Sequence, residues 1–501
     1  MAASILVLSA VLLSAVAEEA GDAPTTATEA PASALPAHRL SAPGPLEPRP
    51  FQLPEAKTAT LSNGLEVLLV ENHEVPLVYL NVVVRSGVAT DFEGLEGLAS
   101  ATLDMMDEGA GERSAEELSK AARRLGVDLS TFAARDYAGT GMQGMVRNLE
   151  PGLDLLADIT LRPTFPAADW EVLQKRKVQN LAAAKSDPNR VAARVFNRVM
   201  HGDAYAGRLT SEASYMAITT EEMKRWHSTH FRPDDALILV GGDTTLDVIV
   251  PLLEARFAEW TAPEAPAPRA QIPAEPPTHA PGTVFLHHIP GAAQSVINMG
   301  VFVMERDDAT APDFMLANRA FGGQFMSRLN LNLREDKGWT YGARSGLSHS
   351  MRPDVWKMSS SVVTPSSVDA IAETFREIEG MSKGGESASG VAFGPLSQDE
   401  LDLVRDGMLY TWPLSFENPG FLLQQRLEMW RFDLPDDWLT GNAERLREVE
   451  LDAAMSAWTS HIHKDRLVIV VVGDSEVVQP GLSELGLTVI PVDADGVPLE
   501  P

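Results

Sequence analysis

The chain has 501 residues, which is enough for two to four domains at about 150 residues each. Its apolar content of 44% is that of an ordinary globular protein, while its formal net charge of −29 argues against nucleic acid and against a basic membrane-binding surface. The chain has no cysteine, which excludes disulfides, thiolate zinc sites and cysteine nucleophiles, so any zinc would need histidine and carboxylate ligands.

The N-terminus predicts export. Residues 1–17 hold an apolar run that ends in Ala15-Val16-Ala17, which is typical of a secretory signal peptide and too short to cross a bilayer. No Lys or Arg precedes Arg39, so the basic n-region of such a peptide is missing. Residues 18–54 are rich in Ala, Pro and Thr and predict a flexible tether. We therefore expect a secreted or periplasmic protein with no transmembrane segment in the mature chain.

The first folded half is expected over residues 55–260. Asn63-Gly64 separates two β-rich runs, which is a strong hairpin signal. Ser114 and Glu117 form a capping box that begins a helix, and Gly126 ends it. The other predicted elements are a strand over 75–87, an amphipathic stretch over 94–111, two strands over 127–147, a helical region over 167–200 that is broken at Asp187-Pro188, and a buried strand before Asp243.

A proline-rich segment predicts the boundary between two domains. Residues 261–281 contain seven prolines, a density at which no regular element persists. The second half is expected over residues 282–480, and residues 481–501 follow it as a tail.

The second half repeats the order of the first. Two strands again come first, a second capping box lies at Ser397 and Glu400, and the closing segment around Trp458 matches that around Trp226. The pattern groups strands with helices and does not alternate them strictly. It predicts the α+β class, with two homologous tandem domains that each have a largely antiparallel sheet and helices packed on one face.

The stretch 321–346 has the highest density of chemically useful residues. Gly322 and Gly323 permit close backbone approach or positive φ, and Gly338 ends a predicted helix before a strand that carries Tyr341. The helix is indicated by apolar residues at spacings of three and four, namely Phe325, Met326, Leu329 and Leu333.

Arg334 and Tyr341 are the candidate functional pair of this stretch. A helix end lies between them, so they cannot share a helix face and would have to converge across a turn. Arginine suits the binding of a carbonyl or carboxylate, and tyrosine suits hydrogen-bond donation to a developing oxyanion. The residues alone leave a plainer alternative open, in which Arg334 is a solvated cation at a helix end and Tyr341 a half-buried strand residue.

The run SRLNLNLREDKGWTYGARS resembles the Arg/Tyr segment in the C-terminal half of the pitrilysin/insulinase family of zinc metallopeptidases, which includes the mitochondrial processing peptidase. The resemblance covers about residues 55–475 and implies the same duplicated architecture, a metallopeptidase/LuxS-like half clamshell. It also implies that Arg334 and Tyr341 reach a zinc site held by another domain or subunit and help to fix the scissile peptide.

The family's own zinc motif is degenerate in this chain. In catalytic members a helix of the first half carries His-x-x-Glu-His, in which two imidazoles bind zinc and the Glu activates its water. In the matching stretch, GLASATLDMMDEGA, Ser100, Leu103 and Asp104 take these three positions. The third ligand, a Glu on the next long helix, should fall within Gln179–Ala184, which contains no carboxylate. The resemblance therefore implies no zinc in this chain and no activity of the chain alone.

Other candidate ligands lack suitable partners. Asp104, Asp107 and Glu108 form an acidic cluster that is typical of a solvated helix end, with a weak calcium site as the alternative. His227-Ser228-Thr229-His230 has a spacing of three, and His461 and His463 could share a strand face, but neither pair has an acid nearby. These histidines are expected to be structural or exposed.

Two hypotheses follow. In the first, the chain is a zinc-less subunit of a heteromeric metallopeptidase that supplies Arg334, Tyr341 and half of a peptide-enclosing chamber, while a homologous partner supplies His-x-x-Glu-His and the zinc. In the second, the fold is a catalytically inactive scaffold or peptide-binding protein. Copurification with a zinc-bearing sister subunit separates them.

Overall fold

The computed structural model describes residues 52–270, 277–349, 353–386 and 392–500. The predicted signal peptide and nearly all of the predicted tether lie outside these residues. In the described part of the chain, no helix combines the length and the apolar character that crossing a membrane requires.

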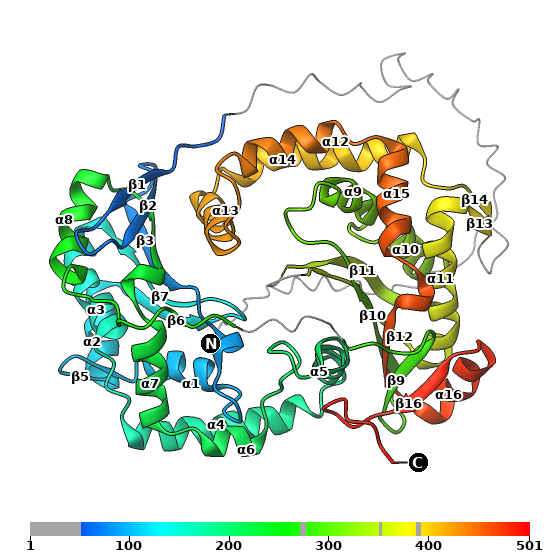
Figure 1. The fold of residues 1–501 in the computed structure, drawn as a ribbon, viewed down its shortest axis with the longest axis horizontal. Coiled ribbons are helices and arrows are strands. Elements are labelled where there is room, and N and C mark those ends of the chain that lie inside the picture. Colours follow the sequence, from blue (N-terminus) through cyan, green and yellow to red (C-terminus); the bar gives the residue numbers. More distant parts are fainter. Residues whose placement is uncertain (1–51, 271–276, 350–352, 387–391, 501) are drawn as a thin grey trace, which may run out of the picture. The chain divides into compact units, whose positions relative to one another are not determined.

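The first half is built on a sheet that has six strands in the described residues, in the order β1-β2-β8-β3-β7-β6 (Figure 1). All neighbours are antiparallel except β2 and β8, which are parallel. Gly64, with a φ of 88°, lies in the turn between β1 and β2, as the Asn63-Gly64 signal predicts. The strands are β1 (Lys57–Thr60), β2 (Glu66–Glu71), β3 (Leu77–Val84), β6 (Val127–Ala133), β7 (Ala138–Met145) and β8 (Ala236–Gly242), with a separate pair β4 (Gly109–Ala110) and β5 (Arg113–Ser114).

The helices of the first half begin and end where the sequence signals predict. Ser114 and Glu117 form the complete capping box of α2, and Gly126 ends that helix in the left-handed conformation. Asp187 caps α5, with Pro188 as its first residue. The helices are α1 (Leu98–Met105), α2 (Ala115–Leu125), α3 (Leu149–Leu161), α4 (Ala167–Ala184), α5 (Pro188–His201), α6 (Glu212–Ala217), α7 (Thr220–His230) and α8 (Leu246–Phe257), with short 3₁₀ turns η2 (Val88–Thr90), η3 (Val146–Asn148) and η4 (Pro233–Asp235).

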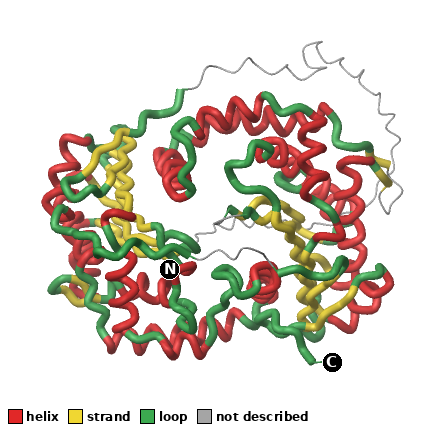
Figure 2. Tube along the Cα trace, viewed as in Figure 1, coloured by secondary structure: helices red, strands yellow, loops and turns green. Residues whose placement is uncertain are grey.

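The second half has an equivalent sheet, again with six strands in the described residues, in the order β11-β12-β10-β15-β9-β16. Here β15 and β9 are parallel, as are β9 and β16, and the other neighbours are antiparallel. Figure 2 shows strands gathered in each half with helices beside them. The strands are β9 (Thr283–His288), β10 (Gln294–Phe302), β11 (Thr340–Ser348), β12 (Val355–Val363), β15 (Val468–Gly473) and β16 (Thr488–Pro491), with a separate pair β13 (Gly385–Glu386) and β14 (Ala392–Phe393).

The helices of the second half include the second predicted capping box, which Ser397 and Glu400 form at the start of α12. The helices are α9 (Ala311–Phe321), α10 (Arg328–Asn330), the π-helix η5 (Leu331–Asp336), α11 (Ser367–Lys383), α12 (Gln398–Ser415), α13 (Pro419–Arg431), α14 (Trp438–Arg447), α15 (Leu451–His461) and α16 (Ser475–Glu484), with 3₁₀ turns η6 (Thr364–Ser366) and η7 (Lys464–Arg466).

The two halves share one topology, which confirms the predicted α+β class with two related, largely antiparallel sheets. In each half the closing strand lies between two earlier strands, so β8 separates β2 from β3 and β15 separates β9 from β10. Trp226 on α7 and Trp458 on α15 are at most 1% exposed and precede these closing strands. The edge strands differ, because β1 precedes its sheet in the sequence whereas β16 follows it. Residues 481–501, expected as a tail, therefore supply part of the second sheet.

Each half covers one face of its sheet with its own helices. The core of the first half joins β2, β3 and β8 to α1, α3, α7 and α8, and the core of the second joins β9, β10, β12 and β15 to α9, α11 and α15. Fully buried tryptophans lie in both cores. Hydrophobic burial against these helices is the main source of stability of each half.

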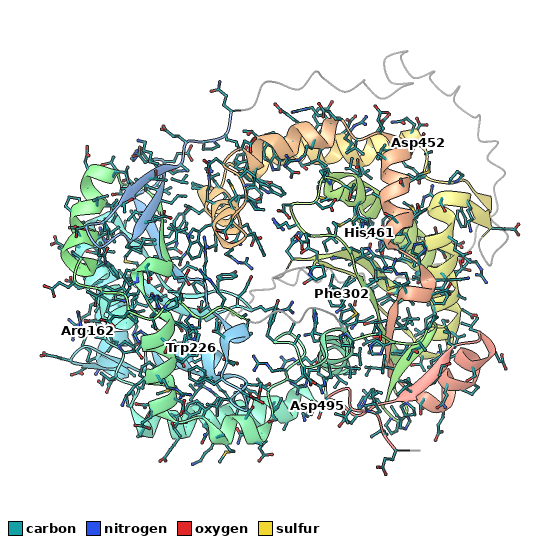
Figure 3. The ribbon with its side chains drawn as sticks, in the orientation of Figure 1. Arg162, Trp226, Phe302, Asp452, His461 and Asp495 are labelled. Atoms are coloured by element: carbon teal, nitrogen blue, oxygen red, sulfur yellow. The ribbon has the colours of Figure 1, made fainter. Side chains whose placement is uncertain are left out.

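The opposite face of each sheet is packed by a helix from the other half. From α5, Val191, Val195 and Phe196 lie against strand residues of the second sheet, such as Val296 and Val470. Conversely, Leu422, Leu423 and Leu427 of α13 lie against Val70, Val83, Leu237 and Leu239 of the first sheet. Charged groups accompany the first of these contacts, because Asp495, labelled in Figure 3, pairs with Lys185 and Arg194. This reciprocal packing explains why β8 is buried along its whole length.

Two expected local structures differ from the prediction. Phe325 and Met326 precede α10, which begins only at Arg328, and their side chains are exposed. The Phe325 carbonyl oxygen accepts a hydrogen bond from the Asn330 side chain and not from a helical backbone N–H. His461 ends helix α15, with His463 just beyond it, so the two do not share a strand face.

Candidate functional site

The helix at the degenerate zinc motif, α1, is held at its N-terminus by Asp91. One carboxylate oxygen accepts from the Gly97 N–H at 2.6 Å and the other from the Ala99 N–H at 2.7 Å. Burial raises the pKa of Asp91 to about 7, although the two backbone hydrogen bonds act in the opposite direction. The start of α1 is thereby fixed, because two of its free N–H groups have a partner.

The two positions that would carry imidazoles lie one turn apart on α1 and are bridged by a lysine. The ammonium nitrogen of Lys177, on α4, lies 3.2 Å from Ser100 Oγ and 2.5 Å from Asp104 Oδ2. The Lys177 side chain is only 11% exposed, whereas that of Asp104 is 47% exposed. The Lys177 nitrogen also lies 5.8 Å from the centre of the Tyr215 ring. A protein cation therefore occupies the space between the two positions.

These residues do not fit a zinc ion. Leu103, at the position of the Glu, is 1% exposed and belongs to the first core, so it offers no donor. Ser100 is a poor zinc ligand, and Asp104 is already paired with an ammonium group that would repel a divalent cation. In the described residues, no group of three or more His, Cys, Asp or Glu side chains is arranged to hold a metal ion. The third-ligand window, Gln179–Ala184, forms the last turns of α4 without a carboxylate.

The calcium alternative has little geometric support. Asp104, Asp107 and Glu108 line an open depression of about 390 Å³, but Arg176 and Lys177 line the same depression. Two cations beside three carboxylates leave little net charge for a hard divalent cation.

His227 and His230 have structural roles. His227 Nε2 lies 2.8 Å from the Thr160 carbonyl oxygen, and His230 Nδ1 lies 2.9 Å from Ser86 Oγ. Burial lowers the pKa of each imidazole to about 4, so both are neutral at physiological pH.

The second candidate region begins with the π-helix, a rare element that is frequent at functional sites. Within it, the Asn332 amide donates to Glu373 at 3.0 Å and to Glu377 at 2.8 Å, and all three side chains are buried. Asn330, just before the π-helix, accepts from the Ala343 N–H of β11 at 3.1 Å. These hydrogen bonds fix the π-helix on α11 and fix β11 beside it.

Arg334 lies on the π-helix and is partly exposed, with 32% of its side chain accessible. Its guanidinium carbon lies 4.4 Å from the centre of the Phe325 ring, and Nη1 lies 2.8 Å from Glu335 Oε1. The neighbouring aromatic ring and carboxylate hold the planar fork in place while leaving part of it accessible.

Tyr341 lies on β11, an edge strand, and is 93% exposed. The pairing of β11 with β12 is irregular between Thr340 and Ala343, which is a β-bulge at Tyr341 and Gly342. Thr340 Oγ1 stabilises this bulge, because it accepts from the Gly342 N–H and donates toward the Ser361 carbonyl oxygen. A bulge directs a side chain away from the regular face of a strand. Among the described residues, no group forms a hydrogen bond with the Tyr341 hydroxyl.

The turn between the two residues forms as the sequence predicts, with Gly338 at a φ of 66°. Gly322 is required for close approach, since a Cβ atom there would lie 2.4 Å from Ser345 Oγ. In the described residues there is no hydrogen bond between Arg334 and Tyr341, so their joint action on one substrate group stays a prediction.

Sequence reasoning missed Lys177. It lies two residues before the window in which a third ligand was sought, and the only signal was a basic residue on the expected ligand helix. Its role depends on the rotation of α4 about its axis, which the weak amphipathicity of that helix does not define.

Comparison with known proteins agrees with this geometry. The model of the insulinase family, peptidase family M16, matches residues 66–213, and that of the peptidase M16 inactive domain matches residues 217–407. An uncharacterized zinc protease of Bacillus subtilis, YmxG, is 23% identical over 294 residues, which cover 58% of this chain and 69% of that protein. Subunit 1 of the mitochondrial cytochrome b-c1 complex of Caenorhabditis elegans is 23% identical over 186 residues, covering 36% of this chain and 38% of the subunit.

A crystal structure of a peptidase M16 inactive domain from Pseudomonas fluorescens has the same fold, with a TM-score of 0.74 and 22% identity over 84% of this chain and 98% of that one. The matching family models, the duplicated α+β fold and the recognisable Arg/Tyr segment agree with one another. The chain belongs to the pitrilysin/insulinase family, peptidase family M16.

Proposed function

We propose that the chain is the zinc-less subunit of a heteromeric M16 metallopeptidase. It supplies Arg334 and Tyr341 to a zinc site on a homologous partner that carries His-x-x-Glu-His, and it forms half of the chamber that encloses the peptide. The zinc belongs to the partner. The apolar run in residues 1–17 supports a secreted or periplasmic location for this complex.

The observation that carries the proposal is the exposure of Tyr341. A tyrosine that is 93% exposed on a stabilised β-bulge, with no hydrogen-bond partner for its hydroxyl in the described residues, is available to an external acceptor. On helix α1, by contrast, the side chains of Ser100 and Asp104 are hydrogen-bonded by Lys177 of the same chain. The chain thus has an accessible hydrogen-bond donor but no metal ligands of its own.

The two residues have different parts in peptide cleavage. Tyr341 donates a hydrogen bond to the oxyanion that forms from the scissile carbonyl, so it acts mainly in the transition state. Arg334 presents a planar fork to a peptide carbonyl or carboxylate, so it also contributes to binding in the ground state.

Steady-state kinetics of the reconstituted pair on a quenched fluorescent peptide tests the proposal. Tyr341→Phe should lower kcat by about 10²-fold with little change in KM, as for removal of one oxyanion donor. Arg334→Ala should raise KM as well as lower kcat, and Arg334→Lys should not fully restore either. Tyr410→Phe, at a tyrosine that is 40% exposed on α12, is the matched control and should keep wild-type rates.

The similarity to a cytochrome b-c1 subunit favours a second candidate function, an inactive scaffold of the same fold. Copurification with a complex that contains no zinc-bearing homologue supports it. Wild-type rates in assembled Tyr341→Phe and Arg334→Ala complexes would also make it the leading function.

A further inference from the structure

The second sheet carries two cations without acidic partners on one face, beside helix α5. Lys357 lies in the middle of β12, opposite Gly300 of β10 and Gly346 of β11. Residues that are paired across antiparallel strands share a face of the sheet. Arg344 of β11 is two residues from Gly346 along the strand and therefore lies on that face too.

The two glycines give Lys357 an unusual setting. The place above Gly300 is filled by the Phe196 ring of α5, and the Lys357 nitrogen lies 4.8 Å from the centre of that ring. The place above Gly346 is open, since a Cβ atom there would meet no atom within 4 Å. The Lys357 side chain is thus packed against Phe196 on the Gly300 side, while the space on the Gly346 side is unfilled.

Neither cation is neutralised by the described part of the chain. No described carboxylate forms an ion pair or hydrogen bond with Lys357 or Arg344, whereas largely buried cations such as Arg328, Lys337 and Arg431 each pair with one. Burial lowers the pKa of Lys357, and no acid among the described residues raises it again. An uncompensated, partly buried ammonium favours an anionic ligand.

We propose that Lys357 and Arg344, which both adjoin the open place above Gly346, bind a carboxylate of the peptide substrate. This proposal rests on the proposed function for its substrate class, and it adds a preference for acidic peptides. The preference is local, because the chain as a whole carries a net charge of −29 and repels anions. Ser359, opposite Arg344 and exposed, supplies a hydroxyl beside the same place.

The carboxylate can come from an acidic side chain or from the peptide C-terminus. Four short peptides of one sequence distinguish these sources: they carry Glu or Gln at the centre, each with a free or an amidated C-terminus. Isothermal titration calorimetry measures their binding to the full mature chain alone, so no zinc-bearing partner is needed.

We expect at least one carboxylate-bearing peptide to bind about tenfold more tightly than the Gln amide. The preference should be lost in Lys357→Met with Arg344→Gln, and persist in Lys383→Met with Arg124→Gln, which remove two exposed cations elsewhere. Met keeps the unbranched stem that packs on Phe196, and circular dichroism checks that the variants fold.

Equal affinity for all four peptides, a preference that survives in the double variant, or no binding of any peptide to the wild-type chain would overturn the inference. The proposed function is judged separately, by the rates of Tyr341→Phe in the assembled complex. A chain that binds peptides without regard to charge, in a complex that needs Tyr341, would retain that function and lose only the acidic preference.

Discussion

The helix pair α1–α4 and the strand β11 differ in how their polar groups are satisfied. At α1–α4, Ser100 and Asp104 are hydrogen-bonded by Lys177 of the same chain. On β11, Tyr341 and Arg344 are exposed and have no partner among the described residues. A region that has lost its metal ligands has thus replaced the metal's charge internally, while the region proposed to act on a partner's substrate keeps accessible donors. Stability should therefore depend on the first region and activity on the second.

The most severe test of this contrast restores the zinc motif. Ser100→His with Leu103→Glu and Asp104→His should bind zinc weakly, because the third ligand is absent and Lys177 remains between the two imidazoles. The new Glu replaces a leucine that is 1% exposed, so the variant should also lose about 3 kcal/mol or more of stability. Calorimetric zinc titration and urea unfolding measure both effects.

Adding Lys177→Ala to that variant is the matched comparison, and it should raise zinc affinity. Nanomolar binding by the triple variant with Lys177 in place would show that the ammonium does not compete with the metal and that another carboxylate faces the site.

Acid should weaken the α1 side of the molecule before the β11 side. His230 on α7, which packs against α1, has a pKa lowered from 6.5 to about 4. Its contribution to stability is fully present above pH 6.5 and is lost as the pH falls toward 4, up to about 3 kcal/mol. Burial also lowers the pKa of His227 on α7 to about 4, so the α1 side has two such imidazoles. Beside the second sheet, burial lowers the pKa of His201 of α5 to about 4 and that of the only partly buried His461, so the effect there is expected to be smaller. His230→Gln should flatten the pH dependence of urea unfolding over that window.

Asp91 acts with the opposite sign, since its pKa is raised to about 7 and its contribution is lost as the pH rises from 4 toward 7. Asp91 is present in the wild type and in His230→Gln, so the difference between their pH-dependent free energies of unfolding isolates His230. Hydrogen exchange at pH 5 should show weaker protection in α1 and α7 than in β11 and β12. Equal loss in both regions would contradict the contrast.

Lys177→Ala should reduce stability by about 1 kcal/mol. A hydrogen bond between charged groups contributes more than this when buried, but Asp104 is about half exposed and solvent screens the pair. Lys175→Ala, at an exposed lysine on the same helix, should change stability by less than about 0.5 kcal/mol. Equal unfolding midpoints for the two variants would show that Lys177 does not stabilise the degenerate site.

The smallest expected effect is on the β11 side. Tyr341→Phe should leave the free energy of unfolding within about 0.5 kcal/mol of wild type, because the side chain is 93% exposed. Thermal unfolding of the isolated chain measures this. A large loss of stability would mean that Tyr341 packs against the protein and that its kinetic effect is structural.

Local signals in the sequence predicted much of the fold. The capping boxes at Ser114 and Ser397 and the turn at Gly64 depend on neighbouring residues only, so they appear in the structure where the pattern places them. The repeated segment around Trp226 and Trp458 predicted the duplication. The insertion of β8 and β15 between earlier strands was not predictable, because strand order depends on contacts between distant segments.

The candidate sites were predicted in part. The loss of zinc ligands at Ser100, Leu103 and Asp104 could be read from residue types alone. The replacement cation, Lys177, could not, because it depends on the packing of α4 against α1. An α-helix was expected around Arg334, but the structure has a π-helix there. The sequence pattern did not reveal this, because the π-helix is held by Asn332 binding the buried glutamates of the distant helix α11. The catalytic roles of Arg334 and Tyr341 stay predictions.

The exchange of α5 and α13 between the halves has a consequence for biosynthesis. When the ribosome has completed the first half, Val70, Val83 and Leu237 still lack α13, the helix that covers them in the finished protein. The apolar side of α5 likewise awaits a sheet that has not been translated. A nascent chain arrested at the end of the first half, near residue 260, should therefore expose two apolar surfaces and bind chaperones, whereas the full-length chain should be released from them.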